Sequence, residues 1–317
     1  MNSKNFLTLQ EPAPAELDQI LDLSLRLKRF RGDGLGREAL SGRSVALIFE
    51  KPSTRTRVSF QVAISELGGF PLSLSAAELQ LGRGETVEDT ARVLSRYVHC
   101  IMARVNRHAD LERLATASSV PVINGLSDLY HPVQVLADLL TLTELKGRLK
   151  GLKVAWVGDG DNVCNSWMFG AALSGIHFTA ASPAHYASPA TLLKKARSLS
   201  RATGAAIKII SDPKVAVKDA DCVITDTFVS MGLDEERRER TKAFLPRYQV
   251  NERLLRSARK DAIFMHCLPA HRGEEVTAGV MDGPHSAIFD EAENRLHTTK
   301  ALLCFLLLSK SDLAKLT

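Results

Sequence analysis

The side chains best suited to bind an anion gather in one short stretch, and they are Ser53, Thr54, Arg55, Thr56 and Arg57. An apolar run at 45–49 comes before them and predicts a buried strand, which Pro52 ends because proline has no N–H to donate to a sheet. We expect Ser53 to cap the helix that follows. A helix start leaves backbone N–H groups free and carries a partial positive charge, so two added guanidinium groups favour phosphate as the ligand. A surface helix with two solvated arginines would give the same pattern.

His131 and Gln134 form a second candidate group, one helical turn apart at the start of an apolar helix expected at 133–146. The imidazole and the amide would lie on one face at a fixed separation, which suits a small carbonyl compound. A lone histidine is more often structural, so it is the nearby glutamine that favours a functional role here.

Three further polar residues follow apolar strands in the second half of the chain, and they are Asn162, Asp226 and Cys267. Open parallel sheets bind ligands at the carboxyl ends of their strands, so these side chains should lie at the binding edge. Asp226 could anchor an amino group with Ser230 as a second acceptor, or it could cap a helix. His266 and Cys267 do not suit a nucleophile–base pair, because neighbours on an extended chain point to opposite faces.

A glycine-bearing turn after one strand resembles the fingerprint of dinucleotide-binding proteins but lacks two of its parts. Gly158 and Gly160 fit the pattern, yet Val163 occupies the position of the third glycine. About twenty residues later, where an acidic residue should end a second strand, the sequence has Ser182. An oxidoreductase is therefore an alternative that this turn does not favour.

Alternating strands and helices across the chain predict an α/β fold with two domains, each a mostly parallel sheet flanked by helices. The strands are expected at 44–49, 71–74, 99–103, 120–123, 153–157, 177–181, 207–210, 222–225 and 261–265. The helices most clearly marked are expected at 7–30, 54–67, 87–97, 109–117, 133–146 and 291–308. We expect a first domain at 1–147, a second at 148–290, and a final segment at 291–317 that packs back on the first, so that helices join the two domains.

Composition narrows the class of protein. The 317 residues carry a formal net charge of +5, with the charges interspersed, so nothing favours nucleic acid as a partner. The longest apolar run, 301–308, is too short to span a membrane. Five scattered cysteines argue against a disulfide framework, and the N-terminus has no apolar targeting segment, so we expect a cytoplasmic protein.

Taken together, these motifs resemble those of the ornithine carbamoyltransferases, within the aspartate/ornithine carbamoyltransferase family, over essentially the full length of the chain. Three further residues carry the resemblance, and they are Gln80 in a glycine-bearing loop, Arg104 after a strand, and Arg295 in the last long helix. Any one motif could arise by chance, but all of them in order with ordinary spacing make a specific signal.

The resemblance implies that one group of residues holds carbamoyl phosphate and a second holds L-ornithine. For carbamoyl phosphate these are Ser53, Thr54, Arg55, Thr56, Gln80, Arg104, His131, Gln134 and Arg295. For ornithine these are Asn162, Asp226, Ser230, Met231, Cys267 and Leu268. The catalytic members would be Arg104, His131, Asp226 and Cys267. Gln80 would reach the phosphate from the neighbouring subunit of a homotrimer or of a multiple of it.

The implied reaction forms L-citrulline and phosphate, as in arginine biosynthesis, and needs no metal and no organic cofactor. Aspartate carbamoyltransferases resemble this chain at the phosphate motif but carry a proline where Cys267 stands. Putrescine or a modified ornithine is an alternative acceptor, and a non-catalytic binding module is a further alternative. One departure from the family pattern is Asp161, where asparagine is common, and it could alter the charge near the ornithine carboxylate.

Overall fold

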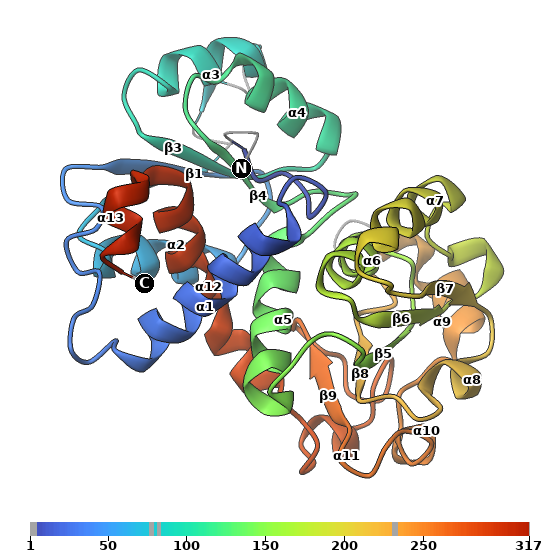
Figure 1. Ribbon diagram of the computed structural model, residues 1–317. Helices are drawn as coiled ribbons and strands as arrows, with labels where there is room; N and C mark the ends of the chain where they lie inside the picture. The colour runs from blue at the N-terminus through green and yellow to red at the C-terminus, as the bar shows by residue number, and fades with distance from the viewer. Residues whose placement is uncertain (1–4, 76–78, 81–83, 230–233, 317) are drawn as a thin grey trace. The chain divides into compact units, whose positions relative to one another are not determined.

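The computed structural model describes residues 5–75, 79–80, 84–229 and 234–316, which form two compact units (Figure 1). The first unit comprises Met1–Leu140 and Glu293–Thr317, and the second comprises Thr141–Ala292. Two helices, α5 (Pro132–Lys146) and α12 (Ile288–Leu307), contain the boundaries and so join the units along the chain. Within the described ranges, no helix is both long enough and apolar enough to cross a membrane.

The first unit is built on four parallel strands in the order β2-β1-β3-β4. They are β1 (Ser44–Phe49), β2 (Phe70–Ser75), β3 (Cys100–Arg104) and β4 (Val122–Leu126). The helices are α1 (Pro14–Arg29), α2 (Arg55–Glu66), α3 (Val87–Leu94), α4 (His108–Ala117) and α13 (Lys310–Ala314), with parts of α5 and α12. Figure 1 shows α3 and α4 over one face of the sheet and α2 on the other. Strand β1 is buried along five of its six residues, because helices cover both faces.

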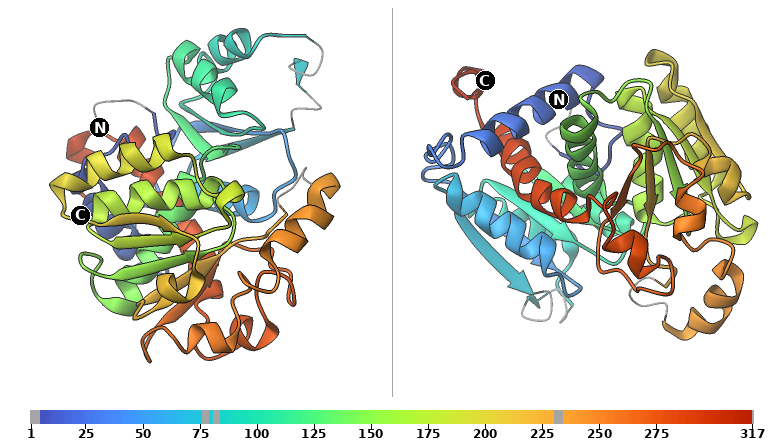
Figure 2. Two further views of the ribbon diagram at one scale, coloured as in Figure 1. Left: turned by 90° about the vertical axis from the view of Figure 1, so that its right-hand side faces the viewer. Right: turned by 90° about the horizontal axis from the view of Figure 1, so that it is seen from below.

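The second unit is built on five parallel strands in the order β7-β6-β5-β8-β9. They are β5 (Lys153–Val157), β6 (His177–Ala181), β7 (Ile207–Ile210), β8 (Cys222–Thr225) and β9 (Ile263–His266). The helices are α6 (Asn162–Ser174), α7 (Ala190–Leu199), α8 (Pro213–Val217), α9 (Arg237–Phe244), α10 (Glu252–Leu255) and α11 (Ala278–Met281), with short 3-10 turns at Ala184–Tyr186, Ser200–Ala202 and Asp234–Glu236. In the views of Figure 2, α6 and α7 run side by side along the sheet.

The strand order fixes where each unit can bind a ligand. In the first unit β1 lies between β2 and β3, and in the second β5 lies between β6 and β8, so the connections leave in opposite directions at these strands. Such switch points open a crevice at the carboxyl ends of the strands. Functional side chains are therefore expected at the carboxyl ends of β1 and β3 in the first sheet, and at those of β5 and β8 in the second.

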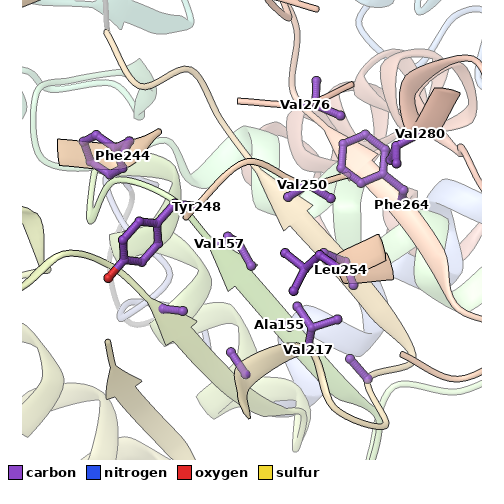
Figure 3. Close-up of a cluster of buried hydrophobic side chains, with 14 of the residues drawn as sticks. Ala155, Val157, Val217, Phe244, Tyr248, Val250, Leu254, Phe264, Val276 and Val280 are labelled. Atoms are coloured by element: carbon purple, nitrogen blue, oxygen red, sulfur yellow. The ribbon is translucent and has the colours of Figure 1, made fainter. Parts of the chain in front are cut away.

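An apolar core packs against the sheet of the second unit (Figure 3). Its members include Val157 of β5, Phe264 of β9 and Phe244 at the end of α9, together with Val250 and Val280. Each of these side chains is almost fully removed from water, which contributes roughly 1.5–3 kcal/mol per side chain. This core anchors the strands from whose ends the polar residues of the unit project.

The predicted α/β fold of two parallel-sheet domains is confirmed, and some element boundaries are corrected. The first helix begins at Pro14 rather than at residue 7, because Phe6 forms a β-bridge with Ile123. The prediction that Ser53 caps α2 is wrong: the cap position is Thr54, whose side chain makes no capping hydrogen bond. Most strands shift by only one or two residues, as is usual for element ends.

Gly68 shows why the turn after α2 needs glycine. It has φ of +80°, and an added Cβ atom would lie 2.5 Å from the carbonyl oxygen of Arg37. Its N–H donates to Ser65 O at 3.0 Å, which closes the last turn of the helix. Both the backbone angle and the close approach therefore exclude a side chain here.

We expect Gly68→Ala to lower the free energy of unfolding by about 2–3 kcal/mol, since it adds a steric clash to the strain of a left-handed backbone. Gly42→Ala is the matched control, because Gly42 has φ of +72° but nothing within 4 Å of an added Cβ. That control should lose only about 1 kcal/mol. Equal losses for the two variants in chemical denaturation would contradict the role given to the Arg37 contact.

Candidate functional site

The predicted anion-binding stretch lies between the end of β1 and the first turn of α2, and its side chains differ in how far they are buried. Thr56 is buried in the first turn of α2, Ser53 and Arg55 are half-buried, and Thr54 is exposed. Arg57 turns back, so that its guanidinium carbon lies 4.5 Å from the centre of the Phe49 ring. Arg57 therefore serves a cation–π contact within the fold, and Arg55 is the arginine of this stretch that acts on the site described next.

Arg295 of α12 joins the anion-binding stretch to α5. Its Nη2 donates to Thr56 Oγ1 at 3.1 Å, and its Nη1 donates to Gln134 Oε1. Gln134 in turn donates from Nε2 to Asp138 Oδ1 at 2.8 Å, which fixes the orientation of the amide. Thr56, Gln134 and Arg295 are each at most 2% exposed. The structure thus brings three residues distant in the sequence together in one buried cluster.

His131 is buried in the first unit, and three arginines act on its imidazole. Burial lowers the pKa of its imidazole well below the usual value, and the nearby charges of Arg295, Arg104 and Arg55 lower it further. The imidazole is therefore neutral at pH 7, although three guanidinium groups are close enough to act on it. A neutral ring can donate one hydrogen bond without adding a fourth positive charge.

This arrangement favours an anion that also carries a neutral polar group. Guanidinium groups match phosphate oxygens in two-point hydrogen bonds, while a neutral imidazole and an amide suit a carbonyl and an amino group. Arg104 stands at the carboxyl end of β3, next to β1 in the sheet, where the strand order places a binding edge. Gln80 is exposed, and no contact described for it joins it to this cluster.

In the second unit, Asp226 and Cys267 follow the neighbouring strands β8 and β9, as expected. Their ligand atoms and those of His266 lie within 4.8 Å of one another. Burial raises the pKa of the Cys267 thiol well above its usual value, and the charge of Asp226 raises it further. A thiol held in its protonated form is a weak nucleophile, which supports the sequence argument against a cysteine–histidine pair.

His266 has a structural role that fixes the loop carrying Cys267 and Leu268. Its Nδ1 accepts the Leu268 N–H at 2.9 Å, so its Nε2 carries the proton and faces Glu275 Oε1 at 3.2 Å. Leu268 is held at φ of +59°, a conformation that costs a residue with a side chain about 1–2 kcal/mol. A strained residue held this firmly at a strand end is typical of a functional loop.

Asn162 begins α6 directly after β5, at the predicted binding edge, and Asp161 before it caps the helix. Oδ1 of Asp161 accepts the N–H groups of Val163 and Cys164, each at 2.9 Å. Burial and the charges of Asp226 and Asp159 raise the pKa of Asp161 well above its usual value. An asparagine could make the same two capping bonds, so the departure from the family pattern preserves the local structure and changes the charge.

The glycines of this turn serve the fold rather than a dinucleotide. A Cβ atom on Gly160 would lie 2.1 Å from the backbone nitrogen of Ser188, and the Gly160 N–H donates to Tyr186 O at 2.7 Å. The loop at 186–188 thus fills the space that a pyrophosphate would need near this glycine.

Asp226 caps no helix within the described segment 227–229, and Ser230 and Met231 lie outside the described residues.

Asp159 and Arg240 form a buried ion pair that the sequence analysis missed. Arg240 Nη1 donates to Asp159 Oδ2 at 2.6 Å and to the carbonyl of Phe228 at 3.2 Å, and the two charged side chains are only 10% and 11% exposed. The pair ties the end of β5 to α9. Asp159 could have been noticed as an acid directly after a strand, but nothing distinguishes Arg240 from the other arginines of its helix.

The sequence and the fold were compared with those of known proteins. Residues 4–144 match the family model described as aspartate/ornithine carbamoyltransferase, carbamoyl-P binding domain, and residues 150–306 match the one described as Asp/Orn binding domain. The chain is 51% identical over 309 residues to an ornithine carbamoyltransferase from Archaeoglobus fulgidus, which covers 98% of this chain and 99% of the relative. It is 52% identical over 300 residues to one from Methanoculleus marisnigri, which covers 95% and 96%.

Solved structures agree with the sequence comparison. The ornithine carbamoyltransferase from Pyrococcus furiosus has a TM-score of 0.92 at 49% identity and covers 96% of each chain. The anabolic ornithine carbamoyltransferase from Campylobacter jejuni has a TM-score of 0.90 at 44% identity and covers 95% of this chain and 98% of the other.

We expect Asp159→Asn to lower the free energy of unfolding by about 3 kcal/mol, because it leaves the Arg240 charge buried without its closest partner. Asp282→Asn is the matched control: Arg272 and Asp282 also lie 2.6 Å apart, but their side chains are 44% and 55% exposed. That variant should lose less than about 1 kcal/mol. If both variants unfold at the same denaturant concentration, burial is not what gives the Asp159 pair its importance.

Proposed function

This chain belongs to the aspartate/ornithine carbamoyltransferase family, and from that premise we propose that it transfers the carbamoyl group of carbamoyl phosphate to L-ornithine, forming L-citrulline and phosphate. The observation that carries the choice of acceptor is the 51% identity, over nearly the full length, to a relative named ornithine carbamoyltransferase. The chemistry of the two clusters described above supports the same choice.

The first unit binds carbamoyl phosphate in this proposal. Arg55 and the hydroxyls of Ser53, Thr54 and Thr56 bind the phosphate oxygens, supported by the free N–H groups at the start of α2. Arg104 and the neutral His131 polarise the carbonyl oxygen, and Gln134 binds the carbamoyl amide. Arg295 is held against Thr56 and Gln134, so it both orients these side chains and adds positive charge for the substrate oxygens.

The second unit binds ornithine. Asp226 attracts the α-ammonium group, and Asn162, Ser230 and Met231 complete the contacts to the amino acid. Cys267 and Leu268 bind near the side-chain amine, where a protonated thiol can exchange hydrogen bonds without adding a full negative charge. The fixed loop around His266 supports this role, because a preorganised contact loses less entropy on binding.

The reaction begins with attack of the neutral δ-amine on the carbamoyl carbon, passes through a tetrahedral intermediate and ends with departure of phosphate. An alkyl ammonium group has a pKa near ~10.4, so forming the neutral amine at pH 7 costs roughly 4.6 kcal/mol. Arg55, Arg104 and Arg295 lower the barrier by stabilising the negative charge that develops on the carbamoyl and phosphate oxygens. Neither a metal nor an organic cofactor takes part in the steps proposed here.

We also propose that the chain assembles as a homotrimer, or a multiple of it, and acts in arginine biosynthesis. Strand β2 is an edge strand of its sheet, and Phe70 on it and Val58 on α2 are large apolar side chains that are more than half exposed. Exposed apolar residues beside a sheet edge favour a partner surface. Gln80, which is exposed, would reach the substrate of a neighbouring subunit. The cytoplasm is the proposed compartment, since all five cysteines are free.

The direct test is an assay for citrulline with carbamoyl phosphate and a panel of acceptors: ornithine, putrescine, N-acetylornithine and aspartate. The proposal expects kcat/KM for ornithine to exceed that for every other acceptor by at least about 100-fold, because only ornithine combines both charged groups of the α-carbon with a δ-amine. A kcat/KM for putrescine or N-acetylornithine above that for ornithine would show that the alternative compound is the acceptor. Failure to carbamoylate any of the four would favour a non-catalytic binding protein.

We expect Arg55→Lys to weaken carbamoyl phosphate binding by about 10- to 100-fold, because lysine cannot make the two-point hydrogen bond of a guanidinium group, which is worth about 1.5–3 kcal/mol. Arg57→Lys serves as the comparison, since the Arg57 guanidinium lies on the Phe49 ring. It should affect affinity much less. Calorimetric titration with carbamoyl phosphate checks both variants, and a larger loss in the Arg57 variant would reverse the assignment.

A further inference from the structure

We propose that the second unit carries a binding site for a divalent transition-metal ion, formed by Nδ1 of His271, the carboxylate of Glu274 and Oε2 of Glu275. These ligand atoms all lie within 4.8 Å of one another, and Nδ1 of His271 is 3.6 Å from Oε2 of Glu275. Two ligands that each lie about 2.1 Å from one zinc-sized ion are roughly 3.4 Å apart in a tetrahedral site. The His271–Glu275 spacing therefore fits one shared ion with only small side-chain movement, and the Glu274 carboxylate lies near enough to move onto the same ion.

The position of Glu275 is what points to a cation site here. Its side chain is fully buried, and Oε1 accepts the N–H of His271 at 2.6 Å and faces Nε2 of His266 at 3.2 Å. Its second oxygen, Oε2, is also buried but accepts no hydrogen bond from any residue that the structure describes. A buried carboxylate oxygen without a hydrogen bond is costly, and the group nearest to this one is the exposed imidazole of His271, 3.6 Å away. An ion between the two would satisfy it.

The backbone around the three ligands is held in place by the protein itself. The amide of Gln249 donates to the carbonyl groups of Gly273 and Glu274 at 2.9 and 3.0 Å, and the Val250 N–H donates to the Glu275 carbonyl at 2.8 Å. Arg272 forms an ion pair with Asp282 on the adjoining segment. A site that is preorganised in this way loses little conformational entropy when the ion binds.

One cation already competes for the site. Arg237 lies 3.1 Å from Glu274, so the ion must share this carboxylate or displace the guanidinium, and both side chains are partly exposed and can adjust. One imidazole with two carboxylates is a mixed nitrogen–oxygen ligand set, which suits Zn²⁺, Co²⁺, Ni²⁺ or Mn²⁺ better than Mg²⁺ or Ca²⁺. Water would complete the coordination.

A neighbouring cluster, Asp226, His266 and Cys267, is a poorer metal site. Both ring nitrogens of His266 are engaged, one by the Leu268 N–H and the other by Glu275. Asp226 and Cys267 belong to the proposed ornithine site. Because Glu275 connects His266 to the new site, a bound ion would also stabilise the loop that carries Cys267. The ion is not needed for carbamoyl transfer, so this inference does not depend on the proposed function.

The test is a titration of the metal-stripped full-length protein with Co²⁺, followed by calorimetry and by visible absorption. We expect saturable binding of one ion per chain without a thiolate-to-cobalt charge-transfer band, since the ligands are nitrogen and oxygen. His271→Gln should weaken binding by about 100-fold. His185→Gln is the control, because His185 is an exposed histidine of the same unit that belongs to neither cluster, and it should bind like the wild type.

Several results would overturn the site. The first is Co²⁺ binding that does not saturate. The second is equal affinity for Co²⁺ in the His271 variant and the wild type. The third is a loss of affinity in the His185 variant equal to that in the His271 variant. A thiolate band would place the ion at Cys267 instead. Since His271 is exposed, its variant should fold normally, and an unchanged thermal unfolding temperature verifies this. Because carbamoyl transfer does not need the ion, failure of the metal site and failure of the proposed function can be told apart.

Discussion

The gathering of guanidinium groups around His131 is the constraint on which the first unit depends. Arg55, Arg104 and Arg295 all act on this one buried imidazole, and Arg295 is itself only 2% exposed. Like charges collected in a poorly hydrated place raise the free energy of the folded protein unless an anion offsets them. The fold tolerates this because Thr56 and Gln134 each accept a hydrogen bond from Arg295. A dianionic substrate would remove the remaining repulsion, which is why we propose carbamoyl phosphate there.

The second unit has the opposite electrostatic character. Asp159, Asp161 and Asp226 act on one another near the ends of β5 and β8, and Arg240 neutralises only the first of them through a direct contact. A surplus of carboxyl groups favours a cationic ligand, as the α-ammonium group of ornithine would be. The two units thus suit two substrates of opposite charge, and in each the parallel strand order supplies the edge at which the charges are presented.

Sequence patterns predicted the fold and much of the two clusters, and failed where contacts depend on tertiary packing. Strand and helix periods identified the sheets, and the position of Asp226 and Cys267 after strands placed them at one edge. The turning of Arg57 onto Phe49 could not be predicted, because a helix start gives no information on which arginine faces inward. The Asp159–Arg240 pair joins segments 81 positions apart, so no local pattern indicates it. Glu275 Oε2 lacks a hydrogen bond because the side chain is buried, and no local pattern predicts that burial.

Burial and the arginines around His131 keep its imidazole neutral. Selective ¹⁵N labelling of histidine, with the ring nitrogen shifts of His131 followed by NMR from pH 8 down to pH 5.5, tests it most directly. Because its pKa is lowered in the folded protein, we expect a neutral imidazole throughout that range in the absence of phosphate. An imidazole of His131 that becomes protonated between pH 6 and pH 7, near the usual pKa of about 6.5, would contradict it.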